Sequence, residues 1–304
     1  RYQLSDSSFM DSPMLIPPRE EQNQIVRFLD WKLAKINKLI RSKKKQIVLL
    51  NEQKQVIINN AVTKGLDPNV PMKDSGIEWI GEIPQDWQIT RIKNIGTAII
   101  GLTYSPANLT DENGTLVFRS SNIKDGKIIY EDNVYVDCEI PEHLKTVAGD
   151  ILICSRNGSR ALVGKCAIID ENSQGHSFGA FTTVLRTKYS KFIYYILNSC
   201  ILKNIMGLFS TSTINQLTTG ILNNIYLPFP PLDVQTNIVK YLDSICMKFD
   251  SIIDKLKKEI DLITEYKTSL ISSVVTGKID VRDIEIPEYE ADSDETIDDE
   301  IDDN

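Results

Sequence analysis

Three polar segments of the chain carry side chains of the types that hydrogen-bond to nucleic acids. Segment 155–160 reads Ser-Arg-Asn-Gly-Ser-Arg, segment 118–124 reads Phe-Arg-Ser-Ser-Asn-Ile-Lys, and segment 210–215 reads Ser-Thr-Ser-Thr-Ile-Asn. Arginine donors match the edge of guanine, an asparagine amide matches adenine, and hydroxyl groups suit phosphates. An ordinary polar turn or helix cap is the alternative for each segment. The candidate DNA contacts are Arg119, Asn122, Lys124, Arg156, Asn157, Ser159, Arg160, Thr211, Thr213 and Asn215.

Other residues that could do chemistry lack the patterns that catalysis needs. The chain has no GxxxxGK[ST] segment, no Asn-Pro-Pro-Tyr or Asn-Pro-Pro-Phe, and no GxGxxG after a predicted strand. Glu52-x-Lys54 matches a fragment of many nucleases, but residues two apart on a helix splay around it. His143 and His176 have no evident serine or cysteine partner. The glycine-flanked segment 178–182 either packs inside the domain or touches DNA, and the sequence leaves both open.

The cysteines and the hydropathy pattern narrow the class of protein. The five cysteines are scattered without CxxC spacing, so we expect neither a disulfide framework nor a zinc site, and no cofactor. No run of 18 apolar residues could cross a membrane, and no signal peptide is evident. The sequence therefore favours a cytoplasmic protein that has no membrane partner.

Two segments of the chain repeat each other. Residues 17–67 and 230–280 align without a gap, so that Pro17 pairs with Pro230. A duplicated segment on either side of a unique block implies a pseudo-two-fold molecule. Such a molecule suits a partner that is itself two-fold, for example duplex DNA.

Each copy of the repeat predicts one long helix. Apolar residues recur at steps of three and four, near the 3.5-residue period of a coiled coil. No proline or glycine falls between Arg19 and Lys64, or between Leu232 and Thr276. A Pro-Pro pair precedes each run and a glycine follows it, which is typical of helix ends. We expect the two helices to pack antiparallel, because the termini of the domain between them should lie close together.

Charge is distributed unevenly along the chain. Residues 283–304 hold twelve Asp or Glu and no Lys or Arg, so the net charge of −8 becomes +4 without them (−8 plus 12). Segment 281–304 is therefore expected to be a disordered acidic tail. Helix 19–64 has eleven Lys or Arg against four Asp or Glu, with a dense cluster at Lys43, Lys44 and Lys45. That cluster resembles the footprint of a polyanion site, and a solvated face is the alternative.

The block between the helices favours short strands divided by turns. Asp125-Gly126 is a hairpin turn signal, and Ser190 is expected to cap a helix that ends at Gly207. These patterns predict one globular domain of mixed α and β structure. The expected strands are 116–119, 127–130, 134–136, 150–154, 163–169 and 182–186.

The repeated motifs now make the chain recognisable. Pro-Pro-x3-Gln-x2-Ile-Val-x2-Leu-Asp opens both copies of the repeat, and Val-Thr followed by a Gly and Lys pair closes both. Segments 76–84, 149–159 and 210–217 look like further motifs of the same family. The chain resembles the specificity subunit of type I restriction–modification enzymes. The resemblance implies recognition domains that each read half of a bipartite DNA site, and paired helices that hold them apart and dock methyltransferase subunits.

The resemblance and the residue patterns together predict an α+β fold. A mixed α/β target recognition domain is flanked by two long helices that form an antiparallel, coiled-coil-like spacer. Only one recognition domain is complete in this sequence. The expected organisation is a tail of a preceding recognition domain (1–18), the first spacer helix (19–67), the recognition domain (68–231), the second spacer helix (232–280) and the acidic tail (281–304).

These expectations lead to one predicted function and two rivals. The chain is predicted to be a non-catalytic, sequence-specific DNA-recognition subunit. Its partners would be double-stranded DNA, methyltransferase (modification) subunits and restriction (translocase and nuclease) subunits, and a homodimer is left open. The alternative is a coiled-coil scaffold or assembly protein whose central domain binds protein. A remote third is a nuclease that uses Glu52 and Lys54.

Overall fold

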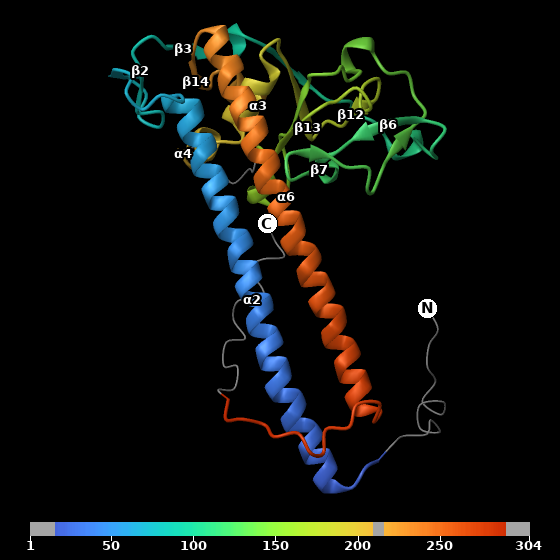
Figure 1. The fold of residues 1–304 in the computed structure, drawn as a ribbon. Helices are drawn as coiled ribbons and strands as arrows, with labels where there is room; N and C mark the ends of the chain where they lie inside the picture. Colours follow the sequence, from blue (N-terminus) through green and yellow to red (C-terminus); the bar gives the residue numbers. More distant parts are fainter. Residues whose placement is uncertain (1–15, 209–215, 290–304) are drawn as a thin grey trace. The chain divides into compact units, whose positions relative to one another are not determined.

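The computed structural model describes residues 16–208 and 216–289, which belong to two compact units. One unit comprises residues 52–248, and the other comprises 1–51 together with 249–304 (Figure 1). Both units contain parts of the same two helices, α2 (Arg19–Lys64) and α6 (Leu232–Val275). We call the first the recognition unit and the second the helix-pair unit. The recognition unit extends beyond the predicted domain bounds of 68–231, because the end of α2 and the start of α6 supply part of its core.

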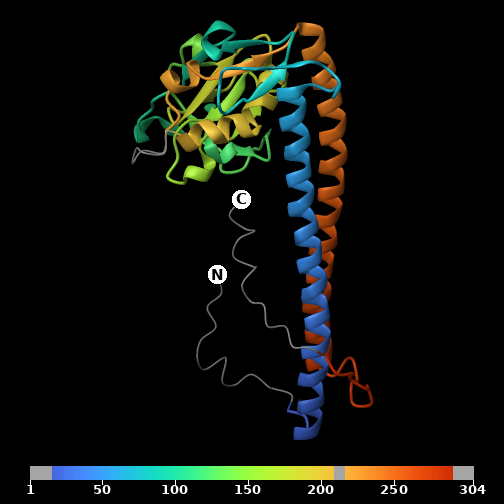
Figure 2. The same cartoon turned by 90° about the vertical axis from the view of Figure 1, so that its left-hand side faces the viewer.

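Within the helix-pair unit, α2 and α6 lie side by side and run antiparallel, as predicted (Figures 1 and 2). Lys43 on α2 forms an ion pair with Glu259 on α6. Further towards the start of α2, the Nζ of Lys267 donates to Oδ1 of Asn37 over 2.9 Å. Residue numbers therefore fall along one helix as they rise along the other. The seam carries half-buried apolar side chains at the expected three- and four-residue steps.

The repeated Pro-Pro-x3-Gln motif forms the same helix start in both copies. The Gln22 Nε2 donates to the carbonyl of Pro17 over 2.8 Å, and the Gln235 Nε2 donates to Pro230 over 2.8 Å. Glutamine thus ties the first helical turn to the proline that precedes it. At the other end, Gly65 has φ +80° and closes α2. Only glycine takes that left-handed conformation readily, which explains the stop.

The segment after α6 departs from the predicted acidic tail. Val281 is 2% exposed and packs with Phe28, Leu270 and Val274. The Nε2 of Gln24 donates to the carbonyls of Val281 (3.0 Å) and Ile284 (2.8 Å). The expectation of disorder from residue 281 was therefore wrong for 281–289. Apolar residues alternate with the charges there, and they bury against the start of α2.

The recognition unit is built on a four-stranded antiparallel sheet. Its order is β11 (Cys166–Ile168), β10 (Ile151–Cys154), β13 (Thr182–Arg186) and β4 (Thr97–Ile100). Strand β10 is buried throughout and its side chains alternate between two cores. Ile151 and Ile153 point into the larger core, whereas Leu152 and Cys154 point into the smaller one. A central strand covered on both faces gives its following loop a fixed base.

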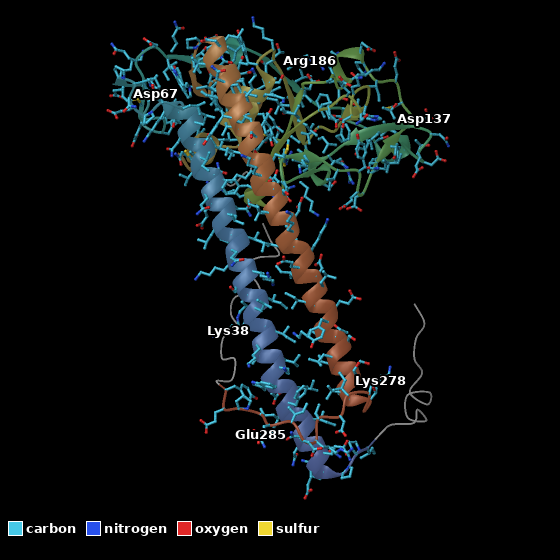
Figure 3. The ribbon with its side chains drawn as sticks, viewed as in Figure 1. Lys38, Asp67, Asp137, Arg186, Lys278 and Glu285 are labelled. Carbon is cyan, nitrogen blue, oxygen red and sulfur yellow. The ribbon has the colours of Figure 1, made fainter. Side chains whose placement is uncertain are left out.

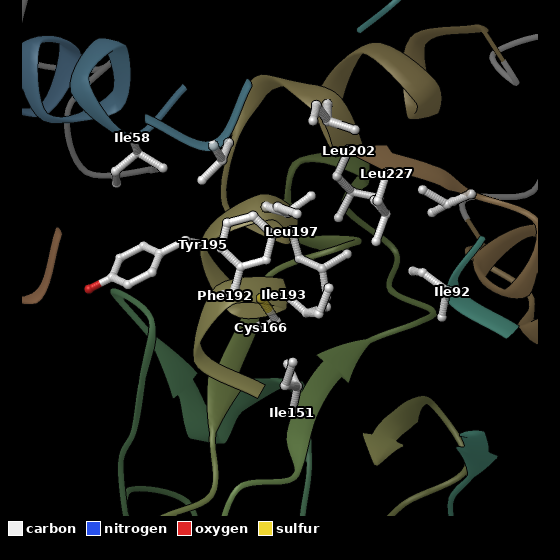
Figure 4. Packing of buried hydrophobic residues seen from close by; sticks show 14 of the residues in the cluster. Ile58, Ile92, Ile151, Cys166, Phe192, Ile193, Tyr195, Leu197, Leu202 and Leu227 are labelled. Carbon is white, nitrogen blue, oxygen red and sulfur yellow. The ribbon is translucent and has the colours of Figure 1, made fainter. Parts of the chain in front are cut away.

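The larger core lies between this sheet and a helical layer (Figure 4). The covering elements are α3 (Ser190–Leu197), α4 (Cys200–Leu208), α5 (Thr219–Asn223) and the pair formed by β3 (Gln88–Arg91) and β14 (Tyr226–Phe229). The end of α2 and the start of α6 complete it. On α6, Asp243 accepts hydrogen bonds from Tyr195 Oη and Lys191 Nζ, both over 2.7 Å. Burial is the main cause that raises the pKa of Tyr195, and the hydrogen bond to Asp243 raises it further, so the hydroxyl remains a donor.

The smaller core joins the first sheet to a second one. That sheet runs β12 (Ser177–Phe178), β6 (Thr115–Phe118), β9 (Tyr135–Val136) and β5 (Leu109–Thr110), with β12 parallel to β6. The other paired strands are β1 (Met72–Asp74) with β2 (Glu82–Pro84), and β7 (Ile123–Lys124) with β8 (Lys127–Ile128). Asp125 and Gly126 have positive φ between β7 and β8, which confirms the predicted hairpin turn. Short 3-10 turns cover 92–94, 106–108, 120–122, 142–144 and 160–162.

The predicted helix from Ser190 to Gly207 is two helices, so that expectation was wrong. Ser199 breaks the run: its Oγ donates to the carbonyl of Ile196 over 2.6 Å and accepts from the backbone of Ile201 over 3.2 Å. It therefore begins α4 as a cap. Ser190 is no cap, because its Oγ donates to the carbonyl of Thr187 over 2.7 Å.

A partly buried ion pair holds the end of β13 that is farther from segment 155–160. Arg186 (Figure 3) reaches Asp150 through two hydrogen bonds of 2.8 Å, and Asp150 is 2% exposed. The guanidinium also donates to the carbonyl of Lys145 over 2.9 Å. This planar two-point geometry favours arginine over lysine at the position.

Candidate nucleic-acid interface

Segment 155–160 is a loop that leaves the buried strand β10. The Ser155 Oγ donates to Oγ1 of Thr183 over 2.6 Å inside the unit. The backbone N–H groups of Ser155 and Arg156 both donate to the carbonyl of Phe181 over 3.0 Å. The base of the loop is thus fixed by hydrogen bonds, whereas the side chains of Arg156, Ser159 and Arg160 are exposed. Within these six residues, the predicted DNA contacts differ in solvent exposure, because Asn157 is only half-buried while Arg156, Ser159 and Arg160 are exposed.

Asn157 holds the loop together and ties it to segment 118–124. Its Nδ2 donates to Oγ of Ser120 over 3.2 Å, and its Oδ1 accepts from the backbone of Ser159 over 3.0 Å. Beneath it, burial raises the pKa of the Cys154 thiol, against an opposing hydrogen bond to Ser120. The thiol therefore stays protonated and is a poor nucleophile. The structure brings two of the three predicted segments together at this point.

Asn122 is structural, which corrects its prediction as a DNA contact. The side chain is fully buried, with 0% exposure. Its Oδ1 accepts from the backbone of Arg119, and its Nδ2 donates to the carbonyls of Ile129 and Glu131, both over 3.1 Å. No atom of Asn122 is left for a ligand. The pattern of a polar loop could not distinguish this inward amide from an outward one.

Arg119 and Lys124 lie on either side of that buried amide. Arg119 donates from one guanidinium nitrogen to the carbonyl of Asp132, and its Nε is buried without a hydrogen-bond partner among the described residues. Lys124 is exposed on the β7–β8 hairpin. Part of the Arg119 guanidinium therefore binds within its own unit, and Lys124 is the exposed cation of this segment.

Thr211, Thr213 and Asn215 lie outside the described residues. The chain is described again from Gln216, which forms an isolated antiparallel bridge with Arg156. The next residue, Leu217, donates its backbone N–H to the carbonyl of Ser155 over 2.8 Å. Residues 216–217 therefore lie against the base of the Arg156 loop.

The structure adds Phe181 to the candidate interface. In the segment that the sequence left undecided, Phe178 is fully buried while Phe181 is 60% exposed. The Cζ of Arg156 lies 5.3 Å from the centre of the Phe181 ring, a cation–π arrangement. The sequence signal that could have indicated Phe181 is an aromatic residue between Gly179 and the strand predicted from 182. Its direction depends on the turn, which the sequence pattern does not specify.

The lysine cluster of the helix-pair unit divides in two. Lys43 turns into the seam, where its side chain is 19% exposed and pairs with Glu259. Lys44 is half-buried and Lys45 is exposed. The like-charged run is therefore not a single outward patch, because consecutive residues on a helix point about 100° apart. The prediction of Lys43 as a DNA contact is therefore corrected, because its side chain pairs the two helices.

The described residues also bear on the rival chemistries. Glu52 is exposed and Lys54 is half-buried on α2. Across residues 16–208 and 216–289, no group of three His, Cys, Asp or Glu is arranged to hold a metal ion. No helix in those ranges is both long and apolar enough to cross a membrane. What the arrangement offers is a rigid surface of arginines beside an aromatic ring, which suits hydrogen bonding to DNA.

Comparison with known families decides the relationship. The family described as "Type I restriction modification DNA specificity domain" matches residues 84–262, which is more than half of the chain. The chain belongs to this family. The match spans the Arg156 loop, Phe181 and the start of α6.

Curated relatives agree with that assignment. The chain is 28% identical over 281 residues to the "Type I restriction enzyme MjaVIII specificity subunit" of Methanocaldococcus jannaschii, covering 88% of this chain and 62% of the relative. It is 29% identical over 207 residues to the "Type I restriction enzyme EcoKI specificity subunit" of Escherichia coli K12, covering 66% and 44%. The chain thus spans about 60% or less of these relatives.

A solved structure supports the fold. A chain from "Structural basis underlying complex assembly and conformational transition of the type I R-M system" matches with a TM-score of 0.66 at 19% identity. The match covers 91% of this chain and 64% of that one. The α+β fold with two long helices, predicted from the sequence, is confirmed.

Proposed function

We propose that this chain is a sequence-specific DNA-recognition subunit of a type I restriction–modification system. The recognition unit would read one half of a bipartite site. The observation that carries the proposal is the exposed Arg156, presented by a loop whose base is hydrogen-bonded to β13 and to the Phe181 carbonyl. A preorganised arginine can make the paired contact to guanine without first ordering its loop. Arg160 and Lys124 add exposed positive charge for phosphates.

The proposal assigns no reaction to this chain. The chemistry would belong to methyltransferase (modification) and restriction (translocase and nuclease) subunits that bind it, and the assembly would act on cellular DNA in the cytoplasm. Family membership supports this division of labour. Whether two copies of the chain join is a separate matter, which light scattering on the purified chain decides.

The helix-pair unit offers a surface for the modification subunits. We call it the apolar stripe, and its members are exposed apolar residues of α2 and α6: Leu39, Leu49, Ile252, Leu262 and Tyr266. Leu39 corresponds to Ile252 in the repeat, and Leu49 corresponds to Leu262. In an antiparallel pair such equivalent positions share one face. A pseudo-two-fold stripe supports docking of two copies of the same partner, each through an apolar helix face.

One substitution tests the stripe. Leu262 is 65% exposed, so Leu262→Glu should leave the helix intact while it abolishes co-purification with the modification subunit. Glu265→Gln, also exposed on α6, is the matched control and should retain the partner. Retention of the partner by Leu262→Glu would remove the stripe from the proposal.

Selective DNA binding tests the reading function. The full chain, assembled with its modification subunits, is incubated with a library of duplexes, and bound sequences are compared with input. Enrichment of one short motif is the expected result, with affinity that falls steeply as salt rises. Binding without any enrichment would refute sequence recognition by this chain.

A further inference from the structure

Phe181 is more exposed than the other described phenylalanines of the recognition unit. Phe118, Phe178 and Phe192 are at most 2% exposed and Phe229 is half-buried, whereas Phe181 is 60% exposed. A single exposed apolar side chain is ordinary in a folded protein. What sets Phe181 apart is that its surroundings hold it in one place beside the candidate reading arginine.

The turn that carries Phe181 is closed on both sides. The N–H and Oγ1 of Thr182 both donate to the carbonyl of Gly179 over 2.8 Å. Gly179 donates its N–H to Phe118 over 2.9 Å. A Cβ on Gly101 would lie 2.2 Å from the carbonyl oxygen of Gly179, so the neighbouring backbone approaches this turn closely. The backbone of the turn is therefore held at several points, and the Phe181 ring projects from this base.

The ring is also coupled to Arg156. The backbone carbonyl of Phe181 accepts a hydrogen bond from the Arg156 N–H over 3.0 Å. The Cζ of the Arg156 guanidinium lies over the Phe181 ring, 5.3 Å from its centre. A guanidinium that stacks on an aromatic face keeps its N–H groups in the plane, directed away from the ring. Arginine donors and an apolar surface are therefore presented together, one beside the other.

Such a pair has a definite complement in the major groove. Arginine donors match guanine, and the apolar group that a base edge presents in that groove is the 5-methyl of thymine. On the basis of the proposed function, we infer that Phe181 is a specificity-determining residue. It contacts the 5-methyl group of a thymine next to the guanine that Arg156 reads.

The test removes the methyl group from DNA and the ring from the protein. The enriched motif is synthesised with each thymine replaced in turn by uracil, which deletes only the 5-methyl. The full chain with its modification subunits should lose roughly fourfold affinity at one such position, the factor that burial of one methyl-sized group gives at about 0.8 kcal/mol. For Phe181→Ala, thymine and uracil should bind equally at that position. The position should lie beside the base at which Arg156→Ala relaxes preference.

Leu109→Ala is the matched control, because Leu109 is an exposed apolar residue (51%) on the second sheet of the same unit. It should keep the fourfold thymine preference. A preference that survives in Phe181→Ala overturns the inference, and so does a uniform loss of affinity on every sequence. Loss of the modification subunit from Phe181→Ala, with DNA preference intact, reassigns the ring to a protein contact. If the wild-type protein enriches no motif, the proposed function itself fails, and this inference with it.

Discussion

The loop 155–160 and the lysine run 43–45 are both short basic segments, yet they use their charges differently. In the loop, Ser155 and Asn157 make side-chain hydrogen bonds within the unit, and the side chains of Arg156 and Arg160 are exposed. In the run, the helix turns consecutive lysines to different sides, so that Lys43 enters the seam and Lys45 faces solvent. Density of charge along a sequence therefore indicates a surface only when the backbone conformation is known.

A second difference concerns rigidity. Backbone groups bond the loop to the carbonyl of Phe181 and to residues 216–217, so these bonds do not depend on the arginine side chains. The Lys43–Glu259 pair depends entirely on its two side chains. Removing an arginine should thus affect a ligand, whereas removing Lys43 should affect only the helix pair. The following substitutions test this contrast.

The largest effect is expected at Asn122, which lies beside the loop but faces inward. Asn122→Ala would leave the Arg119 N–H and the carbonyls of Ile129 and Glu131 without their bonds. We expect a loss of about 3 kcal/mol in the free energy of unfolding, measured by urea denaturation. Asn113→Ala, in an exposed turn, should change it by less than about 0.5 kcal/mol. Unchanged stability in Asn122→Ala would return the residue to the candidate contacts.

Arg156→Ala should act on recognition and leave the fold intact. The expected loss is about 1–3 kcal/mol on the enriched motif, with relaxed preference at one or two base pairs. Binding to unrelated duplexes should barely change. A competition assay over a half-site library measures both. An equal loss on all sequences would make Arg156 a phosphate contact, and no loss would leave the loop as a solvated turn.

Lys44→Gln combined with Lys45→Gln should give a smaller and less selective effect. If both lysines neutralise phosphates, binding to all duplexes weakens alike and the salt slope falls by up to about two units. Lys278→Gln, an exposed lysine of the same unit, should leave the slope unchanged. An unaltered slope in the double variant, with loss of the modification subunit, would assign these lysines to protein docking.

Lys43→Leu should have the smallest effect. The second copy of the repeat has Leu256 at the corresponding position, so leucine fits this kind of seam. The exposed partner Glu259 can return to water, and the change in unfolding free energy should stay within about 1 kcal/mol. DNA affinity should be unchanged. A clear weakening of DNA binding by Lys43→Leu would contradict the division of the lysine run described above.

The sequence predicted those elements whose signals are local or repeated. The two long helices and the Asp125-Gly126 hairpin lie where periodicity and turn residues placed them. Each of the six predicted strands overlaps an observed one, but 127–130 is a strand only at 127–128 and 163–169 only at 166–168. The break at Ser199 was missed, because apolar spacing continues through it while its cap forms through the side chain. Inward and outward asparagines, and the buried and exposed phenylalanines at 178 and 181, could not be told apart either. Their directions are set by contacts with residues distant in the chain, which a single sequence does not encode as a pattern.

Mutations in strand β10 and mutations in the loop that follows it should have different consequences. The four side chains of β10 serve two cores, so variation within the strand is restricted by folding. The outward positions of the loop that follows are exposed, where substitutions are tolerated better than in a core. Under the proposed function, substitutions at these exposed positions would alter the target sequence while the core residues of β10 stay unchanged. Selection for a new target and selection for a stable protein would then act on different residues, even though these residues are neighbours in the chain.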